Sequence, residues 1–271
     1  MITDWDDAYA NGPHIPGAEG YVSQWESRSA RFRGAHPAAR HRVLRHGPAP
    51  REESDLFLPE AEPRGLFVFI HGGYWRSMHR SMWSHLAAGA LARGWAVAIP
   101  GYTLCPDARI GAITREIEGA LDMAARELDG PVVIAGHSAG GHLAARMGCA
   151  DLAPECAARI ERIVPISGLA DLRPLMRTAM NADLRLDLDE ARRESPALLE
   201  PRGGFDLTCW VGANERPEFL RQNALLANVW TGMEIETRQV EARGHHHFSV
   251  IADLEDPRSA LCETLFGDGL R

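Results

Sequence analysis

Short apolar runs alternate with longer amphipathic segments along most of the chain after about residue 64. Runs of strand length occur at residues 65–70, 95–100, 132–135, 160–167, 207–212 and 234–240. Helical patterns lie between them at residues 82–92 and 110–128, and another follows the last run at 249–266. In the second helical segment, Ile113, Ile117 and Leu121 repeat on one face. Strands that alternate with helices predict an α/β fold with a doubly wound, mostly parallel sheet.

Two segments interrupt this alternation. Residues 1–45 form an N-terminal arm with a helical pattern in which Tyr21, Trp25 and Phe32 can lie against the body of the protein. Packing is the favoured role of these aromatic residues, and lining a pocket is the alternative. Residues 169–204 combine short helical pieces with several prolines, which predicts a small lid over the strand ends. Without repeats or low-complexity linkers, we expect a single domain over residues 1–271.

The composition places the chain among ordinary soluble proteins. It has 271 residues with 45% apolar and 24% charged side chains, enough for one sizeable core. No apolar run approaches the roughly 18 residues of a membrane span, and the first residues lack a signal-peptide pattern. We therefore expect a cytoplasmic protein that does not enter membranes. The five scattered cysteines suit free thiols in a reducing compartment.

The charged residues exclude several kinds of chemistry. The net charge is −8 and no basic block is present, which argues against nucleic-acid binding. The sequence contains no lysine, so Schiff-base chemistry on lysine is excluded. No cysteine or histidine set has metal-ligand spacing, and we expect neither a metal nor another cofactor. The expected partner is a small-molecule substrate, and a homodimer is compatible with the sequence.

The strongest functional motif is Gly-x-Ser-x-Gly around Ser138. The apolar run at residues 132–135 leads into it and an Ala-rich helical pattern follows it, which is the context of a nucleophile elbow. Glycine-sized residues at positions 136 and 140 would let the backbones on either side of the tight turn pass each other. Ser138 is therefore the candidate nucleophile, and a purely structural glycine-rich turn is the alternative.

A second motif precedes the elbow. The run at residues 65–70 ends in His71, Gly72, Gly73, Tyr74 and Trp75, where a hydrolase of this architecture carries its oxyanion-binding loop. Backbone N–H groups of Gly72, Gly73 or Tyr74 could stabilise a developing negative charge, as could the N–H of the residue after the serine, Ala139. We expect Trp75 and His71 to line the substrate pocket, with Trp75 closing the acyl side.

A serine nucleophile needs a base, and the histidine is expected after the last strand. His245, His246 and His247 lie there, and only one of them can meet Ser138 because adjacent side chains point in different directions. His247 is favoured, because it lies nearest the following helix and because Phe248 could fix its loop on the core. A metal site formed by these histidines is the remaining alternative.

The acid that orients the histidine is harder to identify. Glu215 follows the run at residues 207–212 and lies where such hydrolases carry the acid. Asp171 is the alternative, because some hydrolases place the acid one strand earlier. Glu218 is expected to be a solvated residue at the start of a helix.

Taken together, these motifs resemble the arylformamidase (kynurenine formamidase) branch of the α/β-hydrolases. The resemblance rests on residues 71–75, 101–106, 136–142, 168–175, 215–222 and 247–248. Within that family, the tryptophan after His-Gly-Gly-x and the acid-x-Pro-Glu-Phe block separate this branch from general carboxylesterases. The resemblance implies a catalytic triad of Ser138, Glu215 and His247. The family position of Glu215 is often aspartate, and Asn223 stands where serine is common.

The resemblance also implies an activity, the metal-independent hydrolysis of N-formyl-L-kynurenine to formate and L-kynurenine. The residues are compatible with it, since a serine hydrolase can attack a formamide through a formyl-enzyme intermediate. A short-chain carboxylesterase uses the same machinery and stays open as a second interpretation. A non-catalytic binding protein on the same fold is a third.

Overall fold

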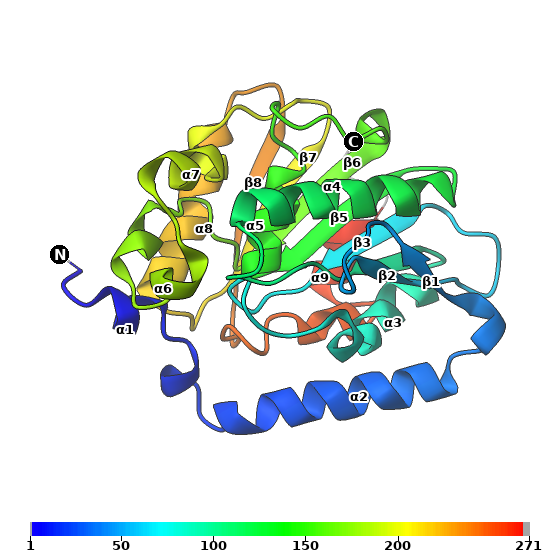
Figure 1. Cartoon of the computed structure of the whole chain (residues 1–271). Coiled ribbons are helices and arrows are strands. Elements are labelled where there is room, and N and C mark those ends of the chain that lie inside the picture. Colours follow the sequence, from blue (N-terminus) through cyan, green and yellow to red (C-terminus); the bar gives the residue numbers. More distant parts are fainter. Residues whose placement is uncertain (1, 268–271) are drawn as a thin grey trace.

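An eight-stranded sheet runs through the middle of the molecule (Figure 1), in a computed structural model that describes residues 2–267. Met1 and residues 268–271, which belong to the predicted domain, lie outside the described part. The strands, in chain order, are β1 (His41–Arg45), β2 (Glu53–Phe57), β3 (Leu66–Ile70), β4 (Ala96–Pro100), β5 (Val132–His137), β6 (Ile160–Ile166), β7 (Asp206–Gly212) and β8 (Glu236–Ala242).

The strand order in the sheet is β1-β2-β4-β3-β5-β6-β7-β8. All neighbours from β4 to β8 run parallel, whereas β2 pairs antiparallel with both β1 and β4. The central strands β3 and β5 are buried along their whole length, as expected for parallel strands with covered faces. The α/β-hydrolase architecture predicted from the sequence is thereby confirmed.

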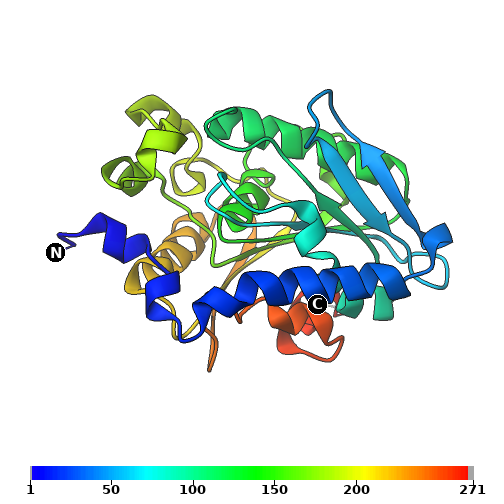
Figure 2. The same ribbon diagram turned by 60° about the horizontal axis from the view of Figure 1, so that its bottom comes forward.

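Helices cover both faces of the sheet (Figures 1 and 2). Those in the described residues are α1 (Trp5–Tyr9), α2 (Tyr21–Ala35), α3 (Ala88–Ala92), α4 (Ile110–Arg126), α5 (Ala139–Arg146), α6 (Asn181–Leu184), α7 (Leu188–Arg193), α8 (Pro217–Trp230) and α9 (Ala260–Phe266). Apolar residues of α4, α5 and α8 share one core cluster with alternate residues of β3. The other residues of β3 pack in a second cluster with α2, α3 and α9. Each face of the sheet therefore has its own hydrophobic core.

The predicted N-terminal arm is not helical throughout. Strand β1 lies inside residues 1–45 and forms an antiparallel hairpin with β2, and the sequence interpretation missed both strands. In β1, only Val43 and Leu44 are apolar, and Val43 is 51% exposed at the edge of the sheet. An edge strand this polar lacks the alternating apolar pattern that reveals strands in a sequence.

Two predicted helices are shorter than expected. The segment at residues 82–92 consists of two 3₁₀ turns followed by α3 (Ala88–Ala92). In the segment at residues 249–266, a 3₁₀ turn ends before Pro257, and only α9 is α-helical. A proline has no N–H to donate, so the helical hydrogen bonds are interrupted there. The last strand also begins at Glu236, two residues later than predicted.

The start of the arm, which contains α1, lies close to the segment at residues 169–204 at one side of the sheet (Figure 1). That segment contains α6 and α7 between β6 and β7. Helix α1 contacts α8 and the 3₁₀ turn Arg173–Arg177. Helix α2 crosses the molecule below the sheet and packs on residues 80–87 (Figure 2). Both segments thus reach the end of the sheet where β5 delivers Ser138.

Candidate active site

Ser138 occupies the sharp turn between β5 and α5. Its backbone angles, φ 57° and ψ −118°, lie in a region that costs a residue with a side chain about 1–3 kcal/mol. A Cβ atom at Gly136 would lie 2.0 Å from the Gly140 carbonyl oxygen, and one at Gly140 would lie 2.0 Å from the Ile70 carbonyl oxygen. Both glycines of the motif are therefore required by close backbone contacts, and the predicted nucleophile-elbow geometry is present.

Glu215 and His247 form a buried pair beside this turn. The Nδ1 of His247 lies 2.6 Å from Oε2 of Glu215, and both side chains are almost inaccessible to solvent. The other oxygen of Glu215 accepts hydrogen bonds from Ser167 Oγ at 2.5 Å and from Gly212 N at 2.8 Å. A carboxylate oxygen accepts hydrogen bonds, so Nδ1 of His247 carries the proton and donates the hydrogen bond to Glu215. In the neutral ring, Nε2 is then the atom able to act as a base.

The alternatives for the base and the acid have other partners. Asp171 is held by Arg173, whose Nε and Nη2 lie 2.9 and 2.8 Å from its two oxygens. The Nε2 of His246 contacts the Tyr21 hydroxyl at 3.1 Å, and Nδ1 of His245 lies 3.3 Å from the Ser249 carbonyl oxygen. The described residues thus bring His247 and Glu215 together and leave the three alternatives in separate contacts.

The predicted oxyanion segment lies next to the serine. A Cβ atom at Gly72 would be 2.7 Å from the His137 carbonyl oxygen and 3.0 Å from Ser138 Cβ, so only glycine fits this position. Gly73 has φ 110°, and Tyr74 follows at φ 50°. This unusual backbone turns the loop around the serine. Ala139 is the first residue of α5, so its N–H has no acceptor within that helix.

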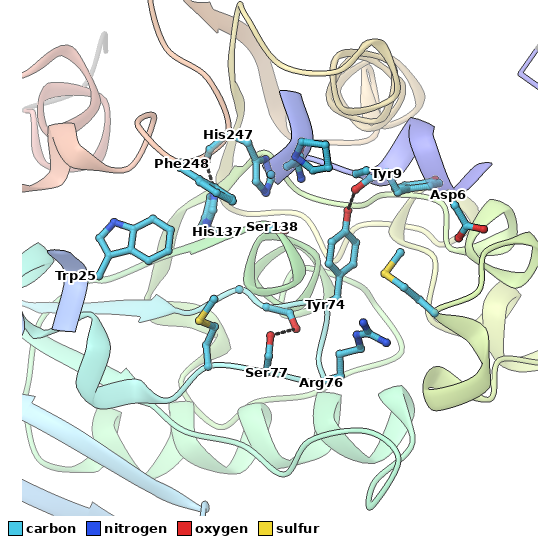
Figure 3. Close-up of a pocket in the computed structure, with 18 of the residues that line it drawn as sticks. Asp6, Tyr9, Trp25, Tyr74, Arg76, Ser77, His137, Ser138, His247 and Phe248 are labelled. Carbon is cyan, nitrogen blue, oxygen red and sulfur yellow. Dashed lines mark hydrogen bonds between the residues drawn. The ribbon is translucent and has the colours of Figure 1, made fainter. Parts of the chain in front are cut away.

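A cavity of about 380 Å³ contains the serine and the histidine in its wall (Figure 3). This volume is in the range of small-molecule sites. Four parts of the chain form the wall: the arm, the segment at residues 72–83, the residues of the elbow and of the histidine loop, and the segment between β6 and β7. The lining residues are Asp6, Tyr9, Ala10, Asn11, Gly12, Pro13, Trp25, Gly72, Gly73, Tyr74, Arg76, Ser77, Met78, Trp83, His137, Ser138, Met180, His247 and Phe248.

His71 and Trp75 are not among these lining residues, which corrects the prediction that they form the pocket wall. Trp75 is fully buried and packs edge-on against His142, with ring centres 5.1 Å apart. His71 stacks on Tyr102 at 4.4 Å, and burial lowers the pKa of His71 to about 3. The motif located the loop correctly but could not indicate which side chains turn inward. Positive φ at both Tyr74 and Trp75 sets these directions.

His137 is a site residue that the sequence interpretation missed. It lines the cavity, and its Nε2 lies 2.8 Å from the His247 carbonyl oxygen, so that nitrogen donates the hydrogen bond. Burial holds the pKa of His137 well below its ordinary value, with the neighbouring His247 acting in the same direction. A neutral His137 therefore ties the histidine loop to the elbow. In the sequence, this residue is only the variable position before the serine.

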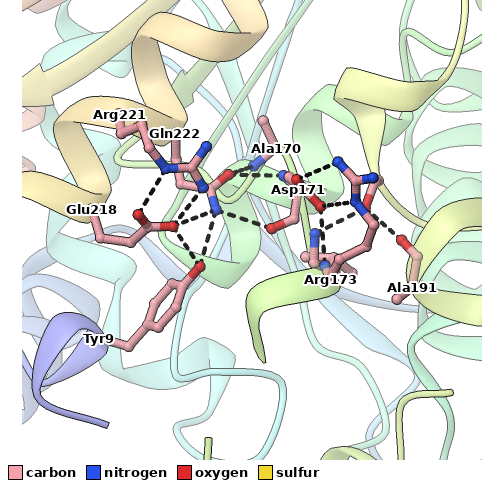
Figure 4. Close-up of polar contacts among 10 residues, drawn as sticks. Tyr9, Ala170, Asp171, Arg173, Ala191, Glu218, Arg221 and Gln222 are labelled. Carbon is pink, nitrogen blue, oxygen red and sulfur yellow. Dashed lines mark hydrogen bonds and ion pairs between the residues drawn. The ribbon is translucent and has the colours of Figure 1, made fainter. Parts of the chain in front are cut away.

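The N-terminal arm is held over the cavity by a buried polar network (Figure 4). The Tyr9 hydroxyl donates to Glu218 Oε1 at 2.7 Å and accepts from Gln222 Nε2 at 3.0 Å. Gln222 Oε1 in turn accepts from the backbone N–H groups of Ala170 and Asp171. Glu218 is 2% exposed and also binds Arg221, so the prediction of a solvated residue was wrong. The network joins α1, α8 and the start of the segment after β6.

Tyr74 makes a second connection to the arm. Its hydroxyl donates to the Tyr9 carbonyl oxygen at 2.6 Å, and its ring forms part of the cavity wall (Figure 3). Burial raises the pKa of Tyr74 far above its ordinary value, so the hydroxyl stays protonated and able to donate. The loop that carries the oxyanion candidates is thereby attached directly to the arm.

Neither a metal site nor a membrane span is found in the part of the chain that the structure describes. Within residues 2–267, no cluster of three or more histidine, cysteine or acidic side chains could hold a metal ion. No helix in this range combines the length and apolar character needed to cross a membrane.

Comparison with known proteins agrees with the fold. A family model described as the alpha/beta hydrolase family matches residues 67–266. The chain therefore belongs to the α/β-hydrolase family. Among its relatives is the kynurenine formamidase of Danio rerio, 27% identical over 81% of this chain and 78% of that protein. The kynurenine formamidase of Drosophila melanogaster is 28% identical, covering 78% and 75%. These relatives confirm the predicted resemblance to the arylformamidase branch.

Solved structures extend the comparison. One from Silicibacter sp. TM1040, whose description as a thioesterase is itself provisional, is 48% identical, with a TM-score of 0.93 over 97% of this chain and 99% of that chain. An esterase from Pyrobaculum calidifontis shares 17% identity and a TM-score of 0.69, over 96% and 95% of the two chains. At that identity, the likeness shows the fold alone. The relatives and neighbours together place the protein in the hydrolase class of enzymes.

Proposed function

We propose that this protein hydrolyses aryl formamides, with N-formyl-L-kynurenine as the substrate, to formate and L-kynurenine. The reaction uses Ser138 as nucleophile, His247 as base and Glu215 as the orienting acid, without a metal ion or other cofactor. The observation that carries the proposal is the 2.6 Å contact of Glu215 with His247, which lies in the wall of a cavity that also contains the strained Ser138. The kynurenine formamidase relatives supply the substrate class.

The first half of the reaction forms an ester with the enzyme. His247 Nε2 takes the proton of Ser138 Oγ while the oxygen attacks the formyl carbon. N–H groups from Gly72, Gly73 or Tyr74, together with that of Ala139, stabilise the negative charge on the carbonyl oxygen. The imidazolium then protonates the aniline nitrogen, the C–N bond breaks, and kynurenine leaves. Ser138 retains the formyl group.

The second half removes the formyl group with water. His247 takes a proton from the water molecule, whose oxygen attacks the formyl carbon, and returns the proton to Ser138 Oγ as the ester bond breaks. Formate is the second product. Glu215 accepts the hydrogen bond from His247 Nδ1 and stabilises the imidazolium in both halves. Every proton transfer is thus assigned to a residue in the cavity wall.

Ester or thioester hydrolysis is the second candidate. The solved relative at 48% identity carries a provisional thioesterase description, and the same triad would cleave such bonds. The two candidates share their chemistry and differ in the group that the cavity must accept.

A substrate panel on the purified protein separates these candidates. We expect kcat/KM for N-formylkynurenine to exceed that for nitrophenyl acetate, nitrophenyl butyrate and an acyl-thioester. A fluorophosphonate probe should label the wild type and not Ser138→Ala, whose turnover should fall by at least about three decades while it stays folded. Preference for the esters or thioesters would assign the second candidate. Labelling that persists in Ser138→Ala would contradict Ser138 as the nucleophile. No turnover of any substrate would contradict an enzyme and leave a binding protein.

A further inference from the structure

The cavity has a charged end and an aromatic end. Among its lining residues, the aspartate and arginine side chains are Asp6 and Arg76. Figure 3 places both on one side of the cavity, away from Trp25 and Phe248. Asp6 comes from α1 in the arm, and Arg76 follows the oxyanion segment at Tyr74. One carboxylate and one guanidinium from two separate segments thus lie at the same end of the cavity.

Both charged groups are fixed by contacts with the segment between β6 and β7. Asp6 Oδ1 accepts a hydrogen bond from the backbone N–H of Ala179 at 2.7 Å. Arg76 Nη1 donates to Asp183 Oδ2 at 2.5 Å. Each contact uses only part of the bonding capacity, because a carboxylate has a second oxygen and a guanidinium has several further N–H donors. The Arg76 side chain is 38% exposed, so its remaining N–H groups can donate to another partner.

We propose that this end of the cavity recognises the α-amino-acid group of the substrate: Arg76 binds the α-carboxylate and Asp6 binds the α-ammonium group. The inference rests on the proposed aryl-formamide activity and adds to it the part of the substrate that sets specificity. A guanidinium matches a carboxylate with two parallel hydrogen bonds, and a carboxylate is the natural partner of an ammonium group. The reacting formamide lies at Ser138, between this end and the aromatic end.

A structural role for the same residues makes a different prediction. If Arg76 served only to hold the segment between β6 and β7, its loss and the loss of its partner Asp183 would have equal effects. Removing Asp183 breaks the ion pair but leaves the guanidinium in the cavity. Asp183→Asn is therefore the matched control for Arg76→Gln.

The test compares two substrates in wild type, Arg76→Gln, Asp6→Asn and Asp183→Asn. One substrate is N-formyl-L-kynurenine, and the other is N-formyl-2-aminoacetophenone, which keeps the formamide and the ketone but lacks the amino-acid group. We expect Arg76→Gln and Asp6→Asn to lower kcat/KM for formylkynurenine at least about tenfold, mainly through KM, because they remove binding that is present throughout the reaction. For the acetophenone, kcat/KM should change less than about twofold in every variant. For Asp183→Asn, kcat/KM should change less than about twofold with either substrate.

The outcomes separate this inference from the proposed function. Equal losses on both substrates, no loss on either, or a loss in Asp183→Asn as large as that in Arg76→Gln would overturn amino-acid recognition while leaving the formamidase intact. Hydrolysis of nitrophenyl acetate by a wild type that cleaves neither formamide would overturn the formamidase and this inference together. Arg76→Lys gives a further readout: restored KM with formylkynurenine supports a role of the positive charge.

Discussion

The direction of the His247 ring depends on one carboxylate. Glu215 accepts three hydrogen bonds, and only the one from His247 links it to the cavity. Ser167 and Gly212 hold the carboxylate so that Oε2 points at Nδ1. In the proposed triad, a glutamate can therefore take a position that is often aspartate in the family, since the surrounding donors fix the longer side chain.

This arrangement makes a prediction about the acid. Glu215→Gln should lower kcat by several decades with little change in Tm, because an amide can hold the wrong histidine tautomer and cannot stabilise the imidazolium. Asp171→Asn should have a milder effect, since Asp171 binds Arg173 and not His247. Steady-state kinetics and thermal melts of both variants provide the measurement. A larger loss of kcat in Asp171→Asn would move the acid one strand earlier.

At the residue scale, the sequence predicts the placement of a residue where the order of the elements fixes that placement. Ser138, Glu215 and His247 each follow the carboxyl end of a parallel strand, so the order of elements already predicts that they lie at the same edge of the sheet. The prediction that His71 and Trp75 line the pocket was wrong because the direction of a side chain in a loop depends on its local φ and ψ, which no motif specifies. His137 and Asp6 carry no pattern of their own, and only the folded chain brings them to the cavity.

At the element scale, the arm acts as a wall of the site. Helix α1 has only five residues, too short to be stable alone, so its position depends on contacts with α8 and with the 3₁₀ turn after β6. Tyr9 supplies the central contacts through its hydroxyl and its carbonyl oxygen. The pattern of the central strands was predictable because both of their faces are buried, whereas the polar edge strand β1 and this short helix were not.

We expect Tyr9→Phe to loosen the arm. The change leaves Glu218 and Gln222 with one partner fewer in a buried site, which costs about 1–3 kcal/mol of stability. KM should rise more than kcat falls, because Tyr9 and its neighbours form the cavity wall and do not touch the reacting atoms in the proposed mechanism. Limited proteolysis should cut the arm faster in this variant.

Tyr21→Phe is the matched control for the arm. It also removes a phenolic hydroxyl, one that contacts His246 at a part-buried position outside the cavity wall. KM should stay near the wild-type value in this control. An equal rise in KM for both variants, or an unchanged KM in Tyr9→Phe, would show that the Tyr9 hydroxyl does not position the wall.

At the scale of the whole molecule, buried histidines couple stability to pH. Burial lowers the pKa of His71 and of His142 to about 3, and that of His85 to about 4, whereas an unfolded chain titrates near 6.5. Below pH 6.5, the unfolded chain therefore binds protons that the folded chain does not. The stability that the buried neutral histidines contribute is complete above pH 6.5. It is lost as the pH falls toward their lower pKa values in the folded chain.

Denaturant unfolding between pH 7 and pH 4.5 should reveal this loss. Each such histidine contributes a slope of up to about 1.4 kcal/mol per pH unit to the free energy of unfolding. His71→Asn should reduce the slope of the unfolding free energy against pH by up to about 1.4 kcal/mol per pH unit, because asparagine does not titrate. Tyr102→Phe removes the hydroxyl that donates to the His71 carbonyl oxygen at 2.9 Å but keeps the buried titrating group, so its slope should match that of the wild type. An unchanged slope in His71→Asn would mean that His71 takes up its proton without unfolding.

The region matched by the family model begins at residue 67, but Asp6, Trp25 and residues 9–13 of the cavity wall precede it. The arm therefore supplies wall residues from outside the matched region, whereas Ser138, Glu215 and His247 lie inside it. For protein engineering, the arm is accordingly the segment to exchange: chimeras that graft it between relatives can transfer substrate preference while conserving the reaction.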